Sequence, residues 1–178
     1  MYPIKTLHTE VLLRNRWYAI RRDDILLPDG SLGEYNVVDR RDAVFIIPVL
    51  PDGRIVLIRH YRHTVRDWVW AVPAGSIEDG IDPTAMARTE LREEIGGRTE
   101  SLTLVGDFFT MPGISNERSY VFLARDVRLG THARDPTEII ESHILEKKDV
   151  YDMVRRGAIK DAPCALALCL VEHLLEDG

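Results

Sequence analysis

Three glutamates in one short segment have the types and the spacing for metal chemistry. Glu90, Glu93 and Glu94 follow a glycine-rich stretch. On a helical wheel of ~100° per residue they fall at ~0°, ~300° and ~40°, so they share an arc of about 100°. Like charges this close repel one another, unless water solvates them or a hard cation such as Mg²⁺ binds their oxygens. The pattern by itself fits a solvated helix face or a metal site.

The helix that carries these glutamates has clear ends in the sequence. Asp82 is a good N-cap residue, and Pro83 suits the first helical position. Gly96 and Gly97 can supply the left-handed residue that ends a helix. The sequence therefore predicts a helix over residues 83–95, with a glycine-rich loop before it.

The segment from Gly75 to Gly97 resembles the Nudix box. That motif consists of Gly, five residues, Glu, seven residues, Arg-Glu, an aliphatic residue, any residue, Glu-Glu, any residue, Gly and an aliphatic residue. Ile81 stands in place of its first glutamate, Thr89 in place of its arginine, and Gly97 in place of its last aliphatic residue. Arg88 and Arg92 are nearby arginines, but neither is in register with the missing one. Six of the nine specified positions match: Gly75, Glu90, Leu91, Glu93, Glu94 and Gly96.

Three further blocks resemble the ADP-ribose pyrophosphatase branch of that family. Residues 56–62 are similar to its Arg-Gln-Tyr-Arg strand, with His60 in place of glutamine. Residues 70–75 are similar to its Trp-Glu-Leu-Pro-Ala-Gly segment, with Ala71 in place of glutamate. Pro112 stands where the branch carries its distinguishing proline. Because the blocks occur in the expected order, they favour the metal site over the solvated face.

The resemblance implies a Mg²⁺-dependent enzyme, with Mn²⁺ as the alternative ion. Its reaction would be hydrolysis of the pyrophosphate bond of ADP-ribose or a related nucleoside diphosphate sugar, giving a nucleoside monophosphate and a sugar phosphate. The resemblance assigns the metal to Glu90, Glu94 and the backbone carbonyl of Ala74. Glu93 would share the metal or hold the catalytic water.

The catalytic base and the substrate contacts are also implied by the resemblance. The family takes its base from a loop before a late strand, here residues 134–141, where Pro136 replaces one of two glutamates. Glu138 is therefore the predicted base, with Glu141 in reserve. Glu117 is open as a metal ligand, a group that supports the metal ligands, a substrate contact, or a salt-bridge partner of Arg118 or another surface arginine. The predicted substrate-binding residues are Arg59, Arg62, Pro112 and Glu117.

The aromatic residues and the cysteines give weaker functional predictions than the glutamates and arginines. Trp17, Tyr35 and Trp68 have rings that can stack on an adenine, although packing in a core or an interface is the commoner role of such residues. Cys164 and Cys169 are the two cysteines, and both lie in one predicted helix near the C-terminus. We expect both to be reduced and buried.

Composition limits the partners. The 178 residues carry 23 Lys and Arg against 29 Asp and Glu, a net charge of −6, so bulk charge does not favour nucleic acid or an anionic membrane. The longest apolar run, residues 164–171, is far shorter than the ~20 residues that cross a bilayer. The first residues lack the features of a signal peptide. A cytoplasmic location with no membrane partner is the expectation.

The order of predicted elements indicates an α/β (α+β) fold. Strand-like runs at 11–14, 17–21 and 35–38, with turn residues at 28–30, predict a small N-terminal antiparallel sheet over 1–40. A compact hairpin is predicted from strands 43–50 and 54–61 around Pro51-Asp52-Gly53. The resemblance implies a Nudix fold over 41–178, with a mixed β-sheet between helices, and a homodimer formed through the N-terminal sheet. Further strands are predicted at 105–110, 119–124 and 139–145, and further helices at 148–156 and 162–175.

Two other functions remain open at this stage. One is hydrolysis of another nucleotide derivative, such as a flavin nucleotide or a mannose-linked diphosphate. The other is nucleotide binding without turnover, as in a sensor. The positions that favour the sensor are the departures from the family pattern: Ala71, Ile81, Thr89 and Pro136.

Overall fold

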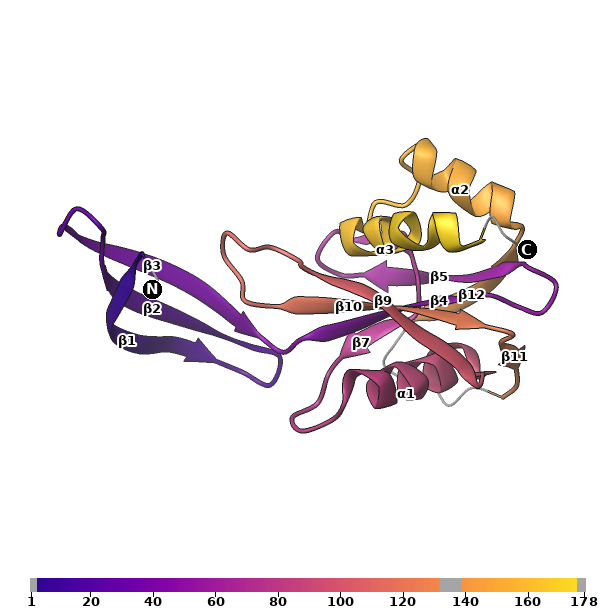
Figure 1. The fold of residues 1–178 in the computed structure, drawn as a ribbon, viewed down its shortest axis with the longest axis horizontal. Coiled ribbons are helices and arrows are strands. Elements are labelled where there is room, and N and C mark those ends of the chain that lie inside the picture. The colour runs from indigo at the N-terminus through magenta and orange to yellow at the C-terminus, as the bar shows by residue number, and fades with distance from the viewer. Residues whose placement is uncertain (1–2, 132–138, 176–178) are drawn as a thin grey trace. The chain divides into compact units, whose positions relative to one another are not determined.

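The computed structural model describes residues 3–131 and 139–175, and the chain divides into two compact units (Figure 1). The first unit contains residues 1–42 and 108–118. The second unit contains residues 43–107 and 119–178.

The first unit is built on a three-stranded antiparallel sheet in the order β1-β2-β3. Its strands are β1 (Lys5–Arg14), β2 (Tyr18–Leu26) and β3 (Leu32–Arg40), each longer than the run that predicted it. The predicted turn lies between β2 and β3, where Gly30 has a φ of 85° and donates its N–H to the Leu27 carbonyl at 2.9 Å. A residue with a side chain would rarely adopt that φ.

Segment 108–118 is attached to β3 although it is far away in sequence. The Val38 N–H donates to the Ile114 carbonyl at 2.7 Å, and Val38 also forms a parallel bridge with Ser115. The side-chain oxygen of Asn116 accepts from the Arg40 N–H at 3.0 Å. The segment therefore belongs structurally to the N-terminal sheet.

The second unit contains two larger sheets. The first has the order β7-β4-β10-β9 and is mixed, because β4 (Ala43–Pro48) pairs antiparallel with β7 (Ala74–Ser76) and parallel with β10 (Arg118–Arg125). In the second sheet, β5 (Ile55–Arg62) lies between β12 (Ile140–Leu145) and β6 (Asp67–Ala71), with antiparallel pairing on both sides. The remaining strands are β9 (Ser101–Phe109), β8 (Gly97–Arg98) and β11 (Arg128–Leu129).

The predicted hairpin of residues 43–50 and 54–61 is wrong as a pairing, although its turn is present. Gly53 has a φ of 85° and donates its N–H to the Leu50 carbonyl at 2.9 Å. The two strands nevertheless belong to different sheets, and their pairing is an isolated bridge between Val49 and Ile55 beside the turn. The reason is that both edges of β4 are already paired, to β7 and to β10, so none is left for β5.

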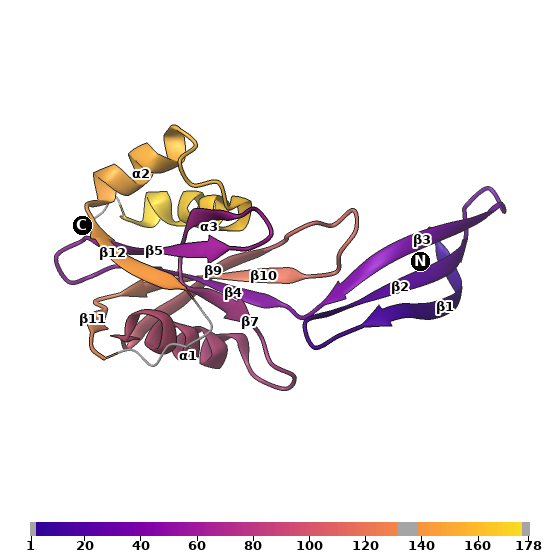
Figure 2. The same ribbon diagram turned by 180° about the vertical axis from the view of Figure 1, so that it is seen from behind.

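Helices cover both sides of these sheets. The helix α1 (Pro83–Ile95) lies on one side, and α2 (Lys147–Arg155) and α3 (Ala162–Glu172) lie on the other, as both views show (Figures 1 and 2). Both α1 and α3 pack against β4, all six residues of which are buried. This is the predicted mixed sheet between helices. None of the helices in the described ranges is long and apolar enough to cross a membrane.

The two cysteines of α3 differ in burial. Cys164 is 1% exposed and its Sγ accepts a hydrogen bond from the Val72 N–H at 3.4 Å. Cys169 is exposed, so the expectation that it is buried is wrong. Five residues along a helix turn the side chain by ~140°, which brings Cys169 to the solvent side. Both thiols are free.

Candidate active site

The acidic helix begins and ends where its capping residues predict. The Asp82 carboxylate accepts from the backbone N–H groups of Thr84, at 2.9 Å, and Ala85, at 3.2 Å. At the other end Gly96 has a φ of 67° and donates its N–H to the Arg92 carbonyl at 2.9 Å. These contacts satisfy backbone groups that a helix end leaves without partners. They fix the position of α1 and of its glutamates.

Two of the three glutamates reach the loop that precedes the helix. Glu94 is only 4% exposed, and its Oε2 accepts the Ala74 N–H at 3.0 Å. Glu90 lies directly against Gly75, where an added Cβ would come within 1.7 Å of the Glu90 Oε1. Glu90 and Glu94 are one turn apart on α1, so they meet successive residues of the loop. The structure thus brings together Ala74, Gly75, Glu90 and Glu94.

Glu93 has a different environment. Its Oε1 is 3.3 Å from Arg92 Nη2, and its side chain is 44% exposed. Across the described residues, no group of three or more His, Cys, Asp or Glu side chains is arranged to hold a metal ion. The donors that the structure brings to the loop are the carboxylates of Glu90 and Glu94. Oxygen donors of this kind suit a hard divalent cation, and the missing Cβ at Gly75 leaves the space that the Glu90 carboxylate occupies.

The loop before α1 is fixed by three hydrogen bonds at consecutive residues. The Val72 N–H donates to Cys164 Sγ, the Pro73 carbonyl accepts from the Ile46 N–H at 2.9 Å, and the Ala74 N–H donates to Glu94. The backbone on both sides of the predicted metal-binding carbonyl is therefore tied to α3, β4 and α1.

The arginine missing from the motif is not replaced by its neighbours on the helix. Arg88 donates through Nη1 to the Thr99 carbonyl at 2.6 Å, and Arg92 contacts Glu93. Ile81 is 43% exposed, so the position of the missing first glutamate faces solvent. The bonds from Cys164, Ile46 and Glu94 restrain the loop in this chain.

The two predicted phosphate-binding arginines lie on β5. Arg59 has its guanidinium carbon 5.4 Å from the ring centre of Trp68 and 5.5 Å from that of Trp70. Arg62, at the end of the strand, is exposed. The indole of Trp68, which we considered for adenine stacking, therefore already has a guanidinium over it. Trp70 was missed in the sequence, although the alternation of Trp68 and Trp70 on a strand predicts one shared face.

Burial shifts the pKa of two side chains, His60 on β5 and Cys164 on α3. Burial lowers the pKa of His60 to about 4, with a smaller contribution from nearby Arg62 and an opposing one from Asp161. Burial also raises the pKa of the Cys164 thiol well above its usual value, and the Asp161 charge acts in the same direction. At neutral pH, His60 is an uncharged imidazole and Cys164 an uncharged thiol.

In the first unit, the buried side chain of Glu117 forms an ion pair with the exposed side chain of Arg40. Its Oε2 is 2.7 Å from Arg40 Nη1, its Oε1 accepts from the Thr110 hydroxyl at 2.9 Å, and the residue is 4% exposed. The salt-bridge alternative therefore holds, with Arg40 as the surface arginine in place of the adjacent Arg118. Pro112 is exposed in the turn that follows Met111.

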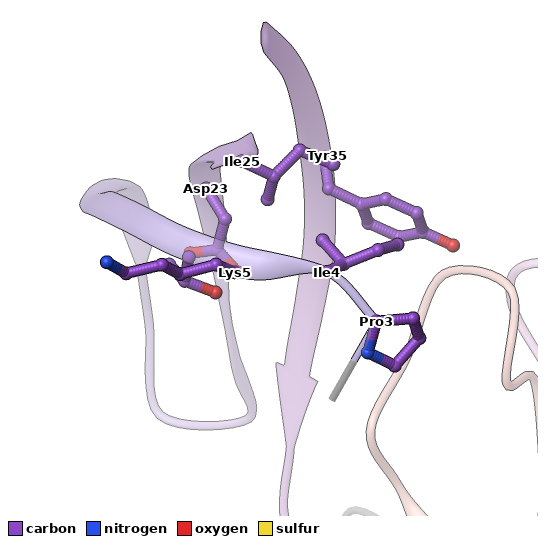
Figure 3. Close-up of a pocket in the computed structure, with 7 residues that line it drawn as sticks. Pro3, Ile4, Lys5, Asp23, Ile25 and Tyr35 are labelled. Atoms are coloured by element: carbon purple, nitrogen blue, oxygen red, sulfur yellow. The ribbon is translucent and has the colours of Figure 1, made fainter. Parts of the chain in front are cut away.

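Two further aromatic candidates also belong to the first unit. Trp17 is 64% exposed, and the guanidinium of Arg16 lies 4.0 Å from its ring centre. Tyr35 lines a hollow on the face of the sheet, together with Asp23 and Ile25 (Figure 3). The Tyr35 hydroxyl donates to the Gly113 carbonyl at 2.9 Å.

The predicted base, Glu138, lies outside the described residues, as does Pro136. The reserve candidate Glu141 lies on β12, where it is exposed and opposite Arg59 in the strand register. Its Oε2 is 3.5 Å from Nε2 of His143, a residue that sequence reasoning missed.

Comparisons with known proteins identify the family of the chain and several relatives. The NUDIX domain family matches residues 39–165, and the nucleoside diphosphate sugar hydrolase N-terminal domain matches residues 4–38. An ADP-ribose pyrophosphatase of Bacillus subtilis (strain 168) is 28% identical over 166 residues, 92% of this chain and 90% of that protein. A methanol dehydrogenase activator of Bacillus methanolicus is 26% identical over 170 residues, 94% of this chain and 92% of that protein.

The fold also matches a solved structure. The crystal structure of an ADP compounds hydrolase has a TM-score of 0.87 to this chain at 22% identity, covering 99% of this chain and 96% of that one. This similarity shows that the two chains share a fold.

Proposed function

Since the chain belongs to the NUDIX domain family, we propose that it hydrolyses the pyrophosphate bond of ADP-ribose or a related nucleoside diphosphate sugar. The products would be a nucleoside monophosphate and a sugar phosphate. The observation that carries the proposal is the meeting of Glu90 and Glu94 with Ala74 and Gly75, on a helix and loop that match the family motif. The ADP-ribose pyrophosphatase relative, which aligns over nearly the whole chain, supports the substrate class.

Each residue has a defined task in this reaction. Glu90, Glu94 and the Ala74 carbonyl would hold Mg²⁺, or Mn²⁺ in its place, with Glu93 sharing the metal or holding a water. A divalent ion there supplies charge neutralisation for the phosphates and lowers the pKa of a bound water. Arg62 and Arg59 bind phosphate oxygens, and Glu138 takes the proton from the attacking water. Pro112 and Glu117 are proposed to lie at the substrate.

Assembly is part of the proposal. All ten residues of β1 are exposed, and exposed apolar side chains in the first unit include Leu7, Leu13 and Trp17. A sheet that exposes apolar side chains in this way is stabilised when a second surface covers them. We propose that a second copy of this chain covers it, giving a homodimer.

The assay of choice measures phosphate release, after phosphatase coupling, from a panel of nucleoside diphosphate derivatives with and without Mg²⁺. We expect metal-dependent release, greatest from ADP-ribose or another diphosphate sugar. Glu90→Gln and Glu94→Gln should each abolish most turnover with the fold intact, because each removes a charge that would bind the metal. Glu100→Gln, an exposed carboxylate on the same unit, is the matched control and should retain activity.

The assay also separates the alternatives. Cleavage of a flavin or mannose-linked diphosphate in preference to ADP-ribose would favour a hydrolase that acts on another nucleotide derivative. Saturable binding of ADP-ribose with no release at any metal concentration would favour a sensor. The observation behind the sensor is that Arg88 and Arg92 contact other groups, so the missing motif arginine has no substitute on α1.

A further inference from the structure

Two residues, Val72 and Pro73, form a linker between the two larger sheets of the second unit. Strand β6 ends at Ala71 in one sheet, and β7 begins at Ala74 in the other. Because proline has no N–H, the linker has one backbone donor, the N–H of Val72. Val72 is 0% exposed, and buried donors without an acceptor are rare in native proteins. The position of the linker therefore depends on the group that accepts this hydrogen bond.

The acceptor is the thiol of Cys164, which lies 92 residues further along the chain. The Val72 N–H donates to Cys164 Sγ at 3.4 Å, and Cys164 is 1% exposed. The Asp161 carboxylate, which caps α3, accepts from the Cys164 N–H at 3.1 Å. A side-chain hydrogen bond with the same carboxylate contributes to the raised pKa of the thiol, so the thiol is the donor in that bond. Cys164 therefore connects the start of α3 to the linker, as an acceptor on one side and a donor on the other.

The residue after the linker is held from the other side of the sheets. The Ala74 N–H donates to Glu94 Oε2 on α1 at 3.0 Å, and α1 and α3 cover opposite sides of these sheets (Figures 1 and 2). Between these two contacts, the Pro73 carbonyl accepts from the Ile46 N–H of β4 at 2.9 Å. Of the three hydrogen bonds, the one from α3 depends on a side chain that is not among the proposed metal ligands.

We propose that Cys164 is a positioning residue for the metal site, and that its thiol holds the linker so that Ala74 meets Glu94 before a metal ion binds. This inference rests on the proposed function, since it takes the loop and the glutamates of α1 as the metal site. Cys164 would not bind the ion itself, because its sulfur is engaged with Val72 and Asp161 and hard cations prefer oxygen ligands. Without the thiol, the loop would hold its binding conformation for a fraction of the time. The apparent Kd of the metal would rise in inverse proportion to that fraction.

Mn²⁺ binding to the full chain tests this role without substrate or turnover. Mn²⁺ is titrated into the metal-free protein, and the free ion is followed by its electron paramagnetic resonance signal. Cys164→Ala removes both the donor and the acceptor, and should raise the Kd of Mn²⁺ roughly 10-fold, as loss of a group that orients metal ligands commonly does. Cys164→Ser keeps a hydroxyl that can accept from Val72 and donate to Asp161, and should restore most of the lost affinity.

Two further variants separate the hydrogen bond from packing. Cys169→Ala makes the same change at the exposed position of the same helix, and should leave the Kd of Mn²⁺ unchanged. Cys164→Val fills the space of the thiol without a polar atom, and should bind Mn²⁺ as weakly as Cys164→Ala. A melting temperature for each variant shows that it is folded during the titration. Parent-like affinity in Cys164→Ala, or a Cys164→Ser variant as weak as Cys164→Ala, would overturn the positioning role.

Turnover of the substrate that the panel selects gives a second readout. Cys164→Ala should raise the Mg²⁺ concentration that gives half the maximal rate roughly 10-fold. The kcat at saturating Mg²⁺ should be nearly unchanged, because excess metal draws the loop back into its binding conformation. A loss of kcat that excess Mg²⁺ does not restore would overturn the role.

The two measurements also distinguish failure of this inference from failure of the proposed function. If the variants differ in Mn²⁺ affinity as expected and the parent chain cleaves no substrate, the positioning role stands and the hydrolase proposal fails. If the parent chain cleaves its substrate and Cys164→Ala matches it in Mn²⁺ affinity, the positioning role alone fails. A parent chain that binds no Mn²⁺ would overturn the positioning role together with the metal site.

Discussion

At the scale of single residues, the candidate site depends on the absence of a side chain at position 75. The carboxylate of Glu90 occupies the space where a Cβ would be, with Oε1 1.7 Å, Cδ 2.2 Å and Cγ 2.9 Å from it. Every one of these atoms belongs to one flexible side chain, so the backbone is under no pressure to move. A methyl group at position 75 would therefore displace the Glu90 carboxylate, which is proposed to bind the metal.

We therefore predict that Gly75→Ala lowers kcat/KM by roughly 10²-fold or more, since misplacing a catalytic group by about 1 Å can cost that much. The free energy of unfolding should change by no more than about 1 kcal/mol, because Glu90 can turn away. Gly106→Ala is the matched control, since a Cβ at Gly106 would meet nothing within 4 Å. Substrate turnover and chemical denaturation measure the two effects. Parent-like turnover in Gly75→Ala would contradict a role for Glu90 in the reaction.

The base is a second single-residue question. We expect Glu138→Gln to lower kcat by about 10²–10⁴, the usual range for loss of a general base, with little change in KM. Glu141→Gln and Glu117→Gln are measured beside it, because Glu141 lies opposite Arg59 in the strand register and Glu117 is paired with Arg40. If Glu138→Gln keeps the parent kcat and Glu117→Gln or Glu141→Gln loses most of it, the base is the residue whose variant is inactive. The reaction class would be unchanged. If all three variants keep the parent kcat, the metal alone activates the water.

At the scale of elements, local signals predicted what local contacts determine. The bounds of α1 agree with prediction because Asp82, Pro83 and Gly96 act within one turn of the helix ends. The strands β6 and β7 were missed because their five and three residues carry little pattern. The separation of β4 from β5 depends on β7 and β10, which approach from elsewhere in the chain. The same holds for Arg40 and Glu117, whose pairing follows from the attachment of segment 108–118 to β3.

Strand β5 also gives a prediction on pH. The pKa of His60 is about 4 in the folded chain against 6.5 as the ordinary value, so the unfolded state binds a proton that the folded state resists. The free energy of unfolding should therefore fall as pH decreases from about 6.5 to about 4, and His60 should contribute no slope above that window. Denaturant titrations at several pH values should show a shallower fall in His60→Gln. His63→Gln, at an exposed position, should follow the parent curve, and a His60→Gln curve parallel to the parent curve would refute the assignment.

At the scale of the whole molecule, the prediction concerns assembly. Sedimentation equilibrium should give about 40 kDa, twice the 20.3 kDa of the chain. Leu13→Glu places a charge on the exposed β1 and should shift the equilibrium towards the monomer. Leu104→Glu makes the same change on β9, where Leu104 is 52% exposed in the other unit, and should leave the dimer intact. A parent chain of about 20 kDa at micromolar concentration would exclude the homodimer.

The unequal cysteines of α3 make the natural chain suitable for site-selective labelling. Cys169 is exposed, whereas Cys164 is buried with a pKa well above its usual value, so a thiol reagent at neutral pH meets a single accessible thiol. A fluorophore or spin label can therefore be attached to α3 without any engineered cysteine. Because Cys164 on the same helix bonds to Val72 beside the candidate metal loop, a probe at Cys169 reports on the helix that supports that loop. Cys164 would react only when α3 separates from the loop. The rate at which a second equivalent of label is incorporated would therefore measure the opening of the core.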